Sequence, residues 1–376
     1  MHSYTAEVQL ARFDRATGGL LGDRRISVWD NPAGSLEEGI ALVDELLAVG
    51  EHTAAGRHAA ATLKLLNRTA RPRTPDDRYD VYHSLYWPLV PPERVNARAR
   101  VITVHDMIPT LFPELVTDEV FERQRAIVTS IDGRRDWVIC NSACTRADFC
   151  RLTAVDRARV FVTPFAARRD VFHPETDPGR IAAALAKYGI RGPGYVLSVC
   201  TLEPRKNLSR LVRAFAALVE REPLDDARLV LTGPEGWKVR ELFELVDGAH
   251  AVRDRIILTG FVADDDLSAL YSGAGVFVYP SLYEGFGLPA LEAMQCGAPV
   301  ITSSTTSLPE VVGAAAITID PTDQDALAQA LLRVLTDPEL ALELRRRGLA
   351  RSDTFSWART VADTVAAYRA MLAASS

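Results

Sequence analysis

The sequence contains few cysteines and pairs none of them in a recognisable motif. Five cysteines occur among 376 residues, and none lies in a Cys-x-x-Cys motif. Zinc sites need clustered Cys and His ligands, so we predict reduced thiols and no metal centre. The seven histidines are also scattered, and no His-Glu-x-x-His pattern is present. This absence excludes the zinc-protease motif.

The sequence also lacks an excess of positive charge and a long hydrophobic run. Lys and Arg number 43 against 49 Asp and Glu, which gives a net charge of −6. A field of that sign repels polyanions, so nucleic acid is not an expected partner. No apolar run reaches the roughly 18 residues that cross a bilayer. The first residues show no basic segment followed by an apolar one, and we predict a cytoplasmic protein.

The length and the hydrophobic pattern indicate two α/β domains. A chain of 376 residues with 48% hydrophobic residues is long enough for about two packed domains. From residue 99 onward, short β-branched runs alternate with longer amphipathic stretches, the pattern of parallel strands joined by helices. The predicted strands cover residues 100–104, 137–140, 159–163, 195–199, 228–232, 255–259, 276–279, 299–302 and 316–319.

Breaker residues indicate where one domain ends and the next begins. Pro and Gly are frequent between residues 172 and 194. We therefore predict an N-terminal domain over 1–172 and a C-terminal domain over 173–355, with an amphipathic helix over 356–373 that packs back on the first domain. Helices are also predicted at 209–220, 265–272 and 323–335, each with apolar residues three and four apart.

The first 75 residues contain two Ala-rich helical segments, 36–49 and 53–68. The second segment is basic, which would suit weak peripheral contact with anionic lipid. A solvated helix face explains the same charges and is the preferred interpretation. The oligomeric state stays open at this stage.

The first motif with chemical potential follows a predicted strand. Residues 198–207 read Ser-Val-Cys-Thr-Leu-Glu-Pro-Arg-Lys-Asn. Ligand sites of open parallel sheets lie beyond the carboxyl ends of the strands. Arg205 offers a planar fork to phosphate oxygens and Lys206 adds a compact charge. Together they suit a diphosphate leaving group, although a solvated Arg-Lys pair is the simpler structural alternative.

The second motif is a Gly-rich turn between two glutamates. The motif covers residues 276–294, Val-Phe-Val-Tyr-Pro-Ser-Leu-Tyr-Glu-Gly-Phe-Gly-Leu-Pro-Ala-Leu-Glu-Ala-Met, in which a strand runs into the turn. Its glycines permit close backbone approach to a sugar or phosphate. Carboxylates accept hydrogen bonds from vicinal hydroxyls, so Glu284 and Glu292 are candidates for holding two sugars. The candidate donor-contacting backbone is that of Gly285, Phe286, Gly287 and Leu288.

The same turn also matches the dinucleotide fingerprint Gly-x-Gly-x-x-Ala. An NAD-dependent oxidoreductase is therefore an alternative, but that fingerprint belongs to the first strand-helix unit and here falls near the seventh. Other strand ends with candidate donor contacts are Gly233, Phe261 and Val262. The acidic run 264–266 could hold a divalent metal, yet Asp264 or Asp265 as a helix N-cap explains it without one.

Two histidines end apolar runs in the first half of the chain. His83 and His105 each occupy such a position, and Asp106 follows the second. A histidine that faces a cleft can bind a sugar hydroxyl. A packed or exposed histidine is the more common outcome for each one taken singly.

Taken together, the motifs resemble those of the family 4 glycosyltransferases. The resemblance rests on residues 201–207, on the Glu-x7-Glu element 284–292, and on 307–313, Ser-Leu-Pro-Glu-Val-Val-Gly. Residues 82–84 and 103–106 resemble its mannosyltransferase-like branch, so the likeness covers roughly residues 79–370. It implies the GT-B fold, two Rossmann-like doubly wound domains facing across a cleft, and transfer with retained anomeric configuration that requires no metal and no other cofactor.

The resemblance also implies roles for individual residues. Arg205 and Lys206 would hold the donor diphosphate, Glu284 the hexose and Glu292 the ribose hydroxyls. His105 would lie near the transferred sugar, and a leaving phosphate oxygen could accept the acceptor's proton. On the acceptor side, His83 and Asp106 are candidates. The sequence departs from the family at its beginning, where residues 17–22 are only a loose counterpart of the usual Gly-rich loop, with Gly18 and Gly19 as its candidates.

The sequence thus predicts a retaining hexosyltransferase that uses a nucleotide sugar. By resemblance GDP-mannose is favoured, with UDP-sugars or other GDP-sugars as alternatives. The acceptor would be a hydroxyl of a small molecule, a glycan or a lipid-linked compound in cell-envelope polysaccharide, glycolipid or secondary-metabolite synthesis. A two-lobed small-molecule binding protein without catalysis is the alternative from another class.

Overall fold

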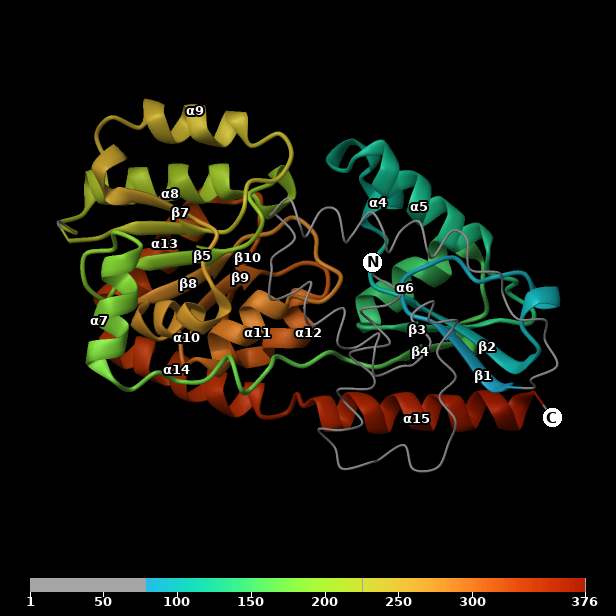
Figure 1. Cartoon of the computed structure of the whole chain (residues 1–376). Helices are drawn as coiled ribbons and strands as arrows, with labels where there is room; N and C mark the ends of the chain where they lie inside the picture. Colours follow the sequence, from blue (N-terminus) through green and yellow to red (C-terminus); the bar gives the residue numbers. More distant parts are fainter. Residues whose placement is uncertain (1–78, 225, 376) are drawn as a thin grey trace, which may run out of the picture. The chain divides into compact units, whose positions relative to one another are not determined.

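The computed structural model describes residues 79–224 and 226–375 (Figure 1). The two helices predicted at 36–49 and 53–68, the basic segment and the candidates Gly18 and Gly19 lie outside the described residues. Among the described helices, none combines the length and the apolar character needed to span a membrane.

The larger sheet has six strands and the doubly wound order. Its strands pair in parallel in the order β10-β9-β8-β5-β6-β7. The chain therefore starts in the middle at β5, runs outward to β7, crosses back to β8 and runs outward to β10. The bounds are β5 Val196–Val199, β6 Leu229–Thr232, β7 Ile256–Gly260, β8 Val276–Tyr279, β9 Val300–Ser303 and β10 Ile317–Ile319.

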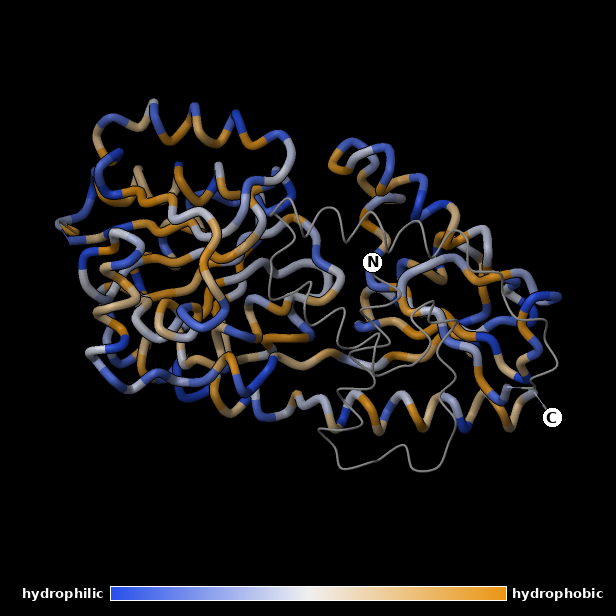
Figure 2. Tube along the Cα trace, in the orientation of Figure 1, coloured by the Kyte–Doolittle hydropathy of each residue, from blue (hydrophilic) through white to orange (hydrophobic). Residues whose placement is uncertain are grey.

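Helices cover both faces of this sheet. Helices α8 and α9 lie on one face with α13 against α8, and α7, α10 and α11 lie on the other (Figure 1). The strands read as continuous apolar runs because both of their faces are covered, and the whole of β8 is buried. Hydrophobic residues concentrate along these strands (Figure 2). The bounds are α7 Pro178–Lys187, α8 Leu208–Arg221, α9 Arg240–Gly248, α10 Asp264–Gly273, α11 Leu288–Gln295 and α13 Gln324–Thr336.

The smaller sheet has four described strands in the order β1-β2-β3-β4. β1 (Tyr79–Ser84) pairs in parallel with β2 (Ala97–Val104), and β3 (Trp137–Cys140) pairs in parallel with β4 (Val160–Val162). The remaining described α-helices are α4 Ile108–Leu111, α5 Asp118–Thr129, α6 Ala143–Thr153, α12 Leu308–Val312, α14 Pro338–Ser352 and α15 Trp357–Ala374.

The described chain divides into two compact units. One comprises residues 79–103, 126–137 and 371–375, and the other comprises 104–125 and 138–370. Within the second unit, the Thr360 hydroxyl of α15 donates to the Pro164 carbonyl oxygen at 2.6 Å. The division into domains at residue 172 and the packing of the last helix on the first domain stay predictions.

The structure confirms the predicted α/β class with two parallel sheets. All nine predicted strands are present, and β3 and β8 have the predicted bounds. β1 was not among the predicted strands, because polar residues and tyrosines interrupt its short apolar run. The predicted N-cap at Asp264 or Asp265 is wrong: α10 begins at Asp264 itself and Ala263 is its N-cap. The acids nevertheless occupy the first turn, where the helix dipole favours negative charge.

Candidate functional site

The two chemical motifs meet at the point where the winding of the large sheet reverses. β5 and β8 are neighbours, yet the chain leaves them toward opposite sides of the sheet. Open α/β sheets bind ligands at this switch point, beyond the carboxyl ends of the two strands. Arg205 and Lys206 follow β5 in the 3-10 turn Pro204–Lys206. Glu284 follows β8. The topology therefore brings both motifs to one place.

Arg205 is held by three acceptors. Its guanidinium lies 2.5 Å from Glu203 Oε1, 2.9 Å from Glu284 Oε2 and 2.6 Å from the Tyr283 carbonyl oxygen. The Arg205 side chain is 12% exposed. A guanidinium that is bonded to three acceptors has little rotational freedom, so the orientation of the Arg205 cation is fixed before any ligand binds.

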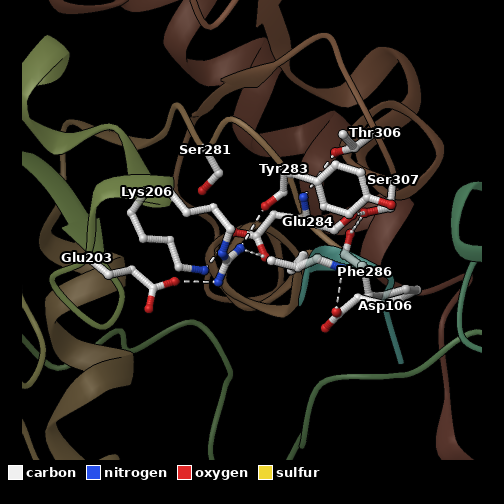
Figure 3. A network of polar contacts seen from close by, with 12 residues as sticks. Asp106, Glu203, Lys206, Ser281, Tyr283, Glu284, Phe286, Thr306 and Ser307 are labelled. Atoms are coloured by element: carbon white, nitrogen blue, oxygen red, sulfur yellow. Dashed lines mark hydrogen bonds and ion pairs between the residues drawn. The ribbon is translucent and has the colours of Figure 1, made fainter. Parts of the chain in front are cut away.

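Lys206 and Glu284 form a buried ion pair (Figure 3). Lys206 Nζ lies 2.6 Å from Glu284 Oε1, and each side chain is 9% exposed. Lys206 Nζ also donates to the Tyr279 hydroxyl at 2.7 Å. Two cations and two carboxylates, Glu203 and Glu284, thus form one compact charged cluster, which we call the ion cluster.

The pKa of each acid in the ion cluster departs from its ordinary value, in opposite directions. Burial alone would raise the pKa of Glu284, but the charges of Lys206 and Arg205 lower it to about 2. Burial raises the pKa of Glu203. For Arg205, burial favours the neutral form, yet the charges of Glu284 and Glu203 outweigh it and raise its pKa. Arg205 and Glu284 therefore stay ionised at neutral pH.

Side chains from the β9–α12 connection hold the Gly-rich turn in place. The Ser307 hydroxyl lies 2.9 Å from the Glu284 carbonyl oxygen and 2.7 Å from that of Phe286 (Figure 3). The Thr306 hydroxyl accepts from the Glu284 amide at 3.2 Å. Gly287, with φ at +115°, forms the N-cap of α11. The backbone of the turn is therefore fixed rather than free.

The segment after β2 lies against the same turn. A Cβ at Gly285 would come within 2.3 Å of the His105 carbonyl oxygen, so only glycine permits this approach. The Thr145 hydroxyl lies 3.1 Å from the Gly285 carbonyl oxygen and 3.4 Å from that of His105. The structure thus brings the candidate His105 to the Gly-rich turn. The His105 ring packs against Phe165 with ring centroids 5.6 Å apart.

Asp106 lies near the ion cluster, and its carboxylate also makes a local hydrogen bond to the backbone. Its Oδ1 accepts from the Ile108 amide at 2.9 Å, at the start of α4. Burial raises its pKa, while that hydrogen bond and the charge of Arg205 oppose the rise. Figure 3 shows Asp106 beside the turn that carries Glu284. The acceptor-side candidate therefore lies with the donor-side candidates.

Glu292 has different surroundings from Glu284. It projects from α11 toward α10, where the Tyr271 hydroxyl donates to its Oε2 at 3.1 Å. Burial raises the pKa of Glu292 to about 7, and the Tyr271 hydrogen bond only partly opposes this. The two acids of the Glu-x7-Glu element therefore differ in ionisation as well as in position.

The other candidates have simpler surroundings. Gly233, with φ at +138°, lies so close to β5 that a Cβ would come within 1.9 Å of the Cys200 carbonyl oxygen. Phe261 is 72% exposed, whereas Val262 is buried. The Phe286 ring packs against Phe165 and Phe355 and lines a cavity of about 310 Å³. His83 Nε2 lies 2.8 Å from Thr103 Oγ1, on the neighbouring strand of its own unit.

Four residues that build the candidate site were not predicted from the sequence. Glu203 belongs to the ion cluster, Tyr279 contacts Lys206 of that cluster, and Thr306 and Ser307 anchor the Gly-rich turn. Both signals were present in the sequence: Glu203 belongs to the same motif as the cations, and a Ser-Ser-Thr-Thr-Ser run begins at the last residue of β9. Within the part of the chain that the structure describes, no three His, Cys, Asp or Glu side chains are placed to hold a metal.

Comparison with known proteins identifies the family. Residues 182–351 match the family described as glycosyl transferases group 1. The O-antigen chain mannosyltransferase B of Escherichia coli is 38% identical over 271 residues, which span 72% of this chain and 70% of that protein. The serotype-specific mannosyltransferase WbdA of Escherichia coli is 33% identical over 280 residues, which span 73% of this chain and 34% of that protein.

Solved structures of glycosyltransferases share the fold. Sucrose-phosphate synthase from Thermosynechococcus elongatus matches with a TM-score of 0.63 and 27% identity, over 79% of this chain and 74% of that one. WaaG, a glycosyltransferase involved in lipopolysaccharide biosynthesis, matches with a TM-score of 0.62 and 21% identity, over 85% and 84%. HepE from Anabaena, solved in complex with UDP, matches with a TM-score of 0.61 and 20% identity, over 77% and 79%. The chain therefore belongs to the group 1 glycosyl transferases, family 4 of the glycosyltransferases, and its two parallel sheets match the GT-B fold.

Proposed function

We propose that this glycosyltransferase moves a hexose from a nucleotide diphosphate sugar to an acceptor hydroxyl, with retention of configuration and without a metal. The observation that carries the proposal is the ion cluster at the switch point of the large sheet. Arg205 and Lys206 there lie side by side, each within 2.9 Å of Glu284. A donor diphosphate and its sugar need both kinds of group at adjacent positions.

In this proposal the cations act on the leaving group. Negative charge grows on the diphosphate as the bond to the sugar breaks, and fixed cations stabilise that charge more than they stabilise the ground state. Arg205 contributes several planar N–H donors for phosphate oxygens, and Lys206 contributes a compact positive charge. Glu284 accepts hydrogen bonds from hexose hydroxyls, and Glu292 accepts them from the ribose.

In this proposal the anomeric configuration is retained because the acceptor approaches the sugar from the same face as the leaving group. A leaving phosphate oxygen then accepts the acceptor's proton, so no separate base is needed. The proposal places His105 beside the transferred sugar and the acceptor near Asp106. The approach of the His105 backbone to Gly285 supports this placement.

Mannose carried on GDP is the preferred donor. The support comes from the two relatives described as mannosyltransferases, at 38% and 33% identity. UDP-sugars are also included among the donors to be tested, because HepE was solved in complex with UDP. A hydroxyl of an envelope polysaccharide is the preferred acceptor, since the first relative is an O-antigen chain enzyme.

A panel of nucleotide sugars tests the proposal. We expect GDP-mannose to raise the melting temperature of the protein most and to be slowly hydrolysed without acceptor, with the released sugar first appearing as the retained anomer by NMR. EDTA should leave the rate unchanged. Glu284→Ala and Lys206→Ala should each remove transfer while unfolding cooperatively.

Matched controls come from an exposed pair on α9. Arg240 and Glu244 form a surface ion pair with side chains 89% and 62% exposed. Arg240→Ala and Glu244→Ala should keep the wild-type rate. Full turnover by either ion-cluster variant would refute its assignment, and binding without any hydrolysis or transfer would favour the non-catalytic alternative.

A further inference from the structure

The Tyr279 hydroxyl contacts the ion cluster, although the sequence analysis predicted no role for this residue. Tyr279 is the last residue of β8 and is 1% exposed. Lys206 Nζ donates to its hydroxyl at 2.7 Å and lies 5.1 Å from the centre of its ring. A buried phenol that contacts a buried ammonium is costly to desolvate unless both are satisfied.

The same hydroxyl lies close enough to Glu284 for the charge of that carboxylate to add to burial in raising the pKa of Tyr279. A phenol has one O–H to donate and lone pairs to accept with. Since an ammonium can only donate, the Tyr279 hydroxyl accepts from Lys206, and its own proton can face the Glu284 carboxylate. Lys206 Nζ lies 2.6 Å from Glu284 Oε1, so the phenol, the ammonium and the carboxylate form a triangle in which Lys206 is bonded to both of the others.

The triangle limits the ways in which Lys206 can turn. An ammonium has three N–H donors. Two of them have acceptors among the described residues, Glu284 Oε1 and the Tyr279 hydroxyl. The third remains for an incoming anion. Two fixed acceptors set the direction of that third donor, which a single acceptor would not do.

The position of the hydroxyl is itself fixed by the sheet. The Thr302 hydroxyl of the adjacent strand β9 donates to the Tyr279 carbonyl oxygen at 2.8 Å. The Tyr279 ring stacks on Phe277 with centroids 6.0 Å apart. A side chain on a central strand is a more rigid support than one on a loop.

We propose that Tyr279 is a positioning residue for glycosyl transfer, whose hydroxyl orients the Lys206 ammonium and the Glu284 carboxylate for the sugar diphosphate. Tyr279 acts through these two groups and does not touch the donor. The inference rests on the proposed function of Lys206 and Glu284, and it adds a third residue on which their geometry depends.

Tyr279→Phe removes the hydroxyl and keeps the ring. Charges that point in the wrong direction stabilise the transition state less, and this loss is larger than the loss of binding energy in the ground state. We therefore expect kcat to fall about tenfold, while the KM for the donor changes by less than about threefold. Steady-state kinetics with the nucleotide sugar that the wild type turns over best measures both.

Tyr195→Phe is the matched control. Tyr195 is 2% exposed, and its hydroxyl donates to the Leu270 carbonyl oxygen at 2.6 Å. Its loss removes one buried hydrogen bond without touching the ion cluster. Both variants should lower the melting temperature, but only Tyr279→Phe should lower kcat. A wild-type kcat for Tyr279→Phe, or an equal loss in both variants, overturns the inference.

A second measurement does not depend on turnover. Binding of GDP and of UDP is measured by calorimetry for Lys206→Met with and without Tyr279→Phe. If Tyr279 acts on the diphosphate through Lys206, the second substitution causes no further loss of affinity. A further loss of more than about threefold in the double variant contradicts the inference.

The two proposals fail in different ways. If the proposed function is wrong, either the wild type shows no transfer at all, or Lys206→Ala and Glu284→Ala retain transfer at the wild-type rate. If only the Tyr279 inference is wrong, those two variants are inactive and Tyr279→Phe is fully active.

Discussion

Lys206 and Glu284 are 78 residues apart in the chain, yet their side chains form a buried ion pair with 2.6 Å between Nζ and Oε1. Neither charge would be stable alone in this position, since an unpaired buried ion costs several kcal/mol, on the order of 3–5. The pair depends on β5 and β8 being neighbours in the sheet. The chemistry of the proposed donor site thus rests on the topology of the fold.

Glu284→Gln should separate binding from transfer. The ion cluster holds two cations, Arg205 and Lys206, and two acids, Glu203 and Glu284. Loss of one carboxylate leaves an excess positive charge, so we expect UDP or GDP to bind about three- to tenfold more tightly. Transfer should fall at least about 100-fold, because the sugar loses its carboxylate. Calorimetry and a transfer assay measure the two effects.

The exposed Glu244 on α9 serves as the control for this variant, and Glu244→Gln should change neither quantity. Weaker nucleotide binding by Glu284→Gln would show that the carboxylate mainly orients the cations rather than competing with the diphosphate.

Glu292 should make stability depend on pH in an unusual direction. Burial raises its pKa to about 7 in the folded state, from an ordinary value of 4.5. Between these values the folded state holds a proton that the unfolded chain has lost, so the free energy of unfolding falls as pH rises from about 4.5 to about 7. Glutamine resembles the protonated acid at every pH. Glu292→Gln should therefore match the wild type near pH 4.5 and be more stable near pH 8, as urea denaturation would show.

Donor binding should show the opposite trend with pH. If the ionised Glu292 accepts hydrogen bonds from the ribose, affinity for the donor rises as pH increases through about 7. Glu292→Gln should bind more weakly and lose this dependence. An unchanged pH dependence in the variant would assign the titration to another group.

Gly285→Ala should damage the site by steric means alone. A Cβ there would come within 2.3 Å of the His105 carbonyl oxygen and 2.7 Å of Asp106 Cβ. Backbone cannot move aside as a flexible side chain does, so we expect a loss of about 1–3 kcal/mol in stability and a large loss of transfer. Gly248→Ala is the control, because a Cβ at that helical position meets nothing within 4 Å. Equal behaviour of the two variants would contradict the close approach.

Asp136→Ala should destabilise the first compact unit. Asp136 Oδ1 lies 2.8 Å from Arg100 Nε, with side chains 2% and 7% exposed. Removing the acid leaves a buried guanidinium unpaired, which we expect to cost about 3–5 kcal/mol. The surface pair of Asp80 and Arg98 offers the comparison, since Asp80→Ala should cost less than about 1 kcal/mol. Chemical denaturation of the three proteins measures the difference.

The strands of the large sheet were predictable because each is a short apolar run that needs burial on both faces. Val276–Tyr279 illustrates this, since its four residues are all buried and the predicted bounds are the observed ones. β1 was harder to predict, because polar residues and tyrosines interrupt its short apolar run and most of its residues are only partly buried. The start of α10 was misplaced, because three consecutive aspartates offer several equally good caps.

The sequence by itself determined the residue types of the proposed donor site and the order of the motifs, since chemistry depends on side-chain identity and strand ends are marked by local patterns. Tertiary structure alone decided which groups became partners. Strand pairing brought Tyr279 and Glu284 to Lys206, and the approach of residue 105 to Gly285 fixed the turn. These contacts join residues far apart in the chain, and their distances and burial set the ionisation of each acid.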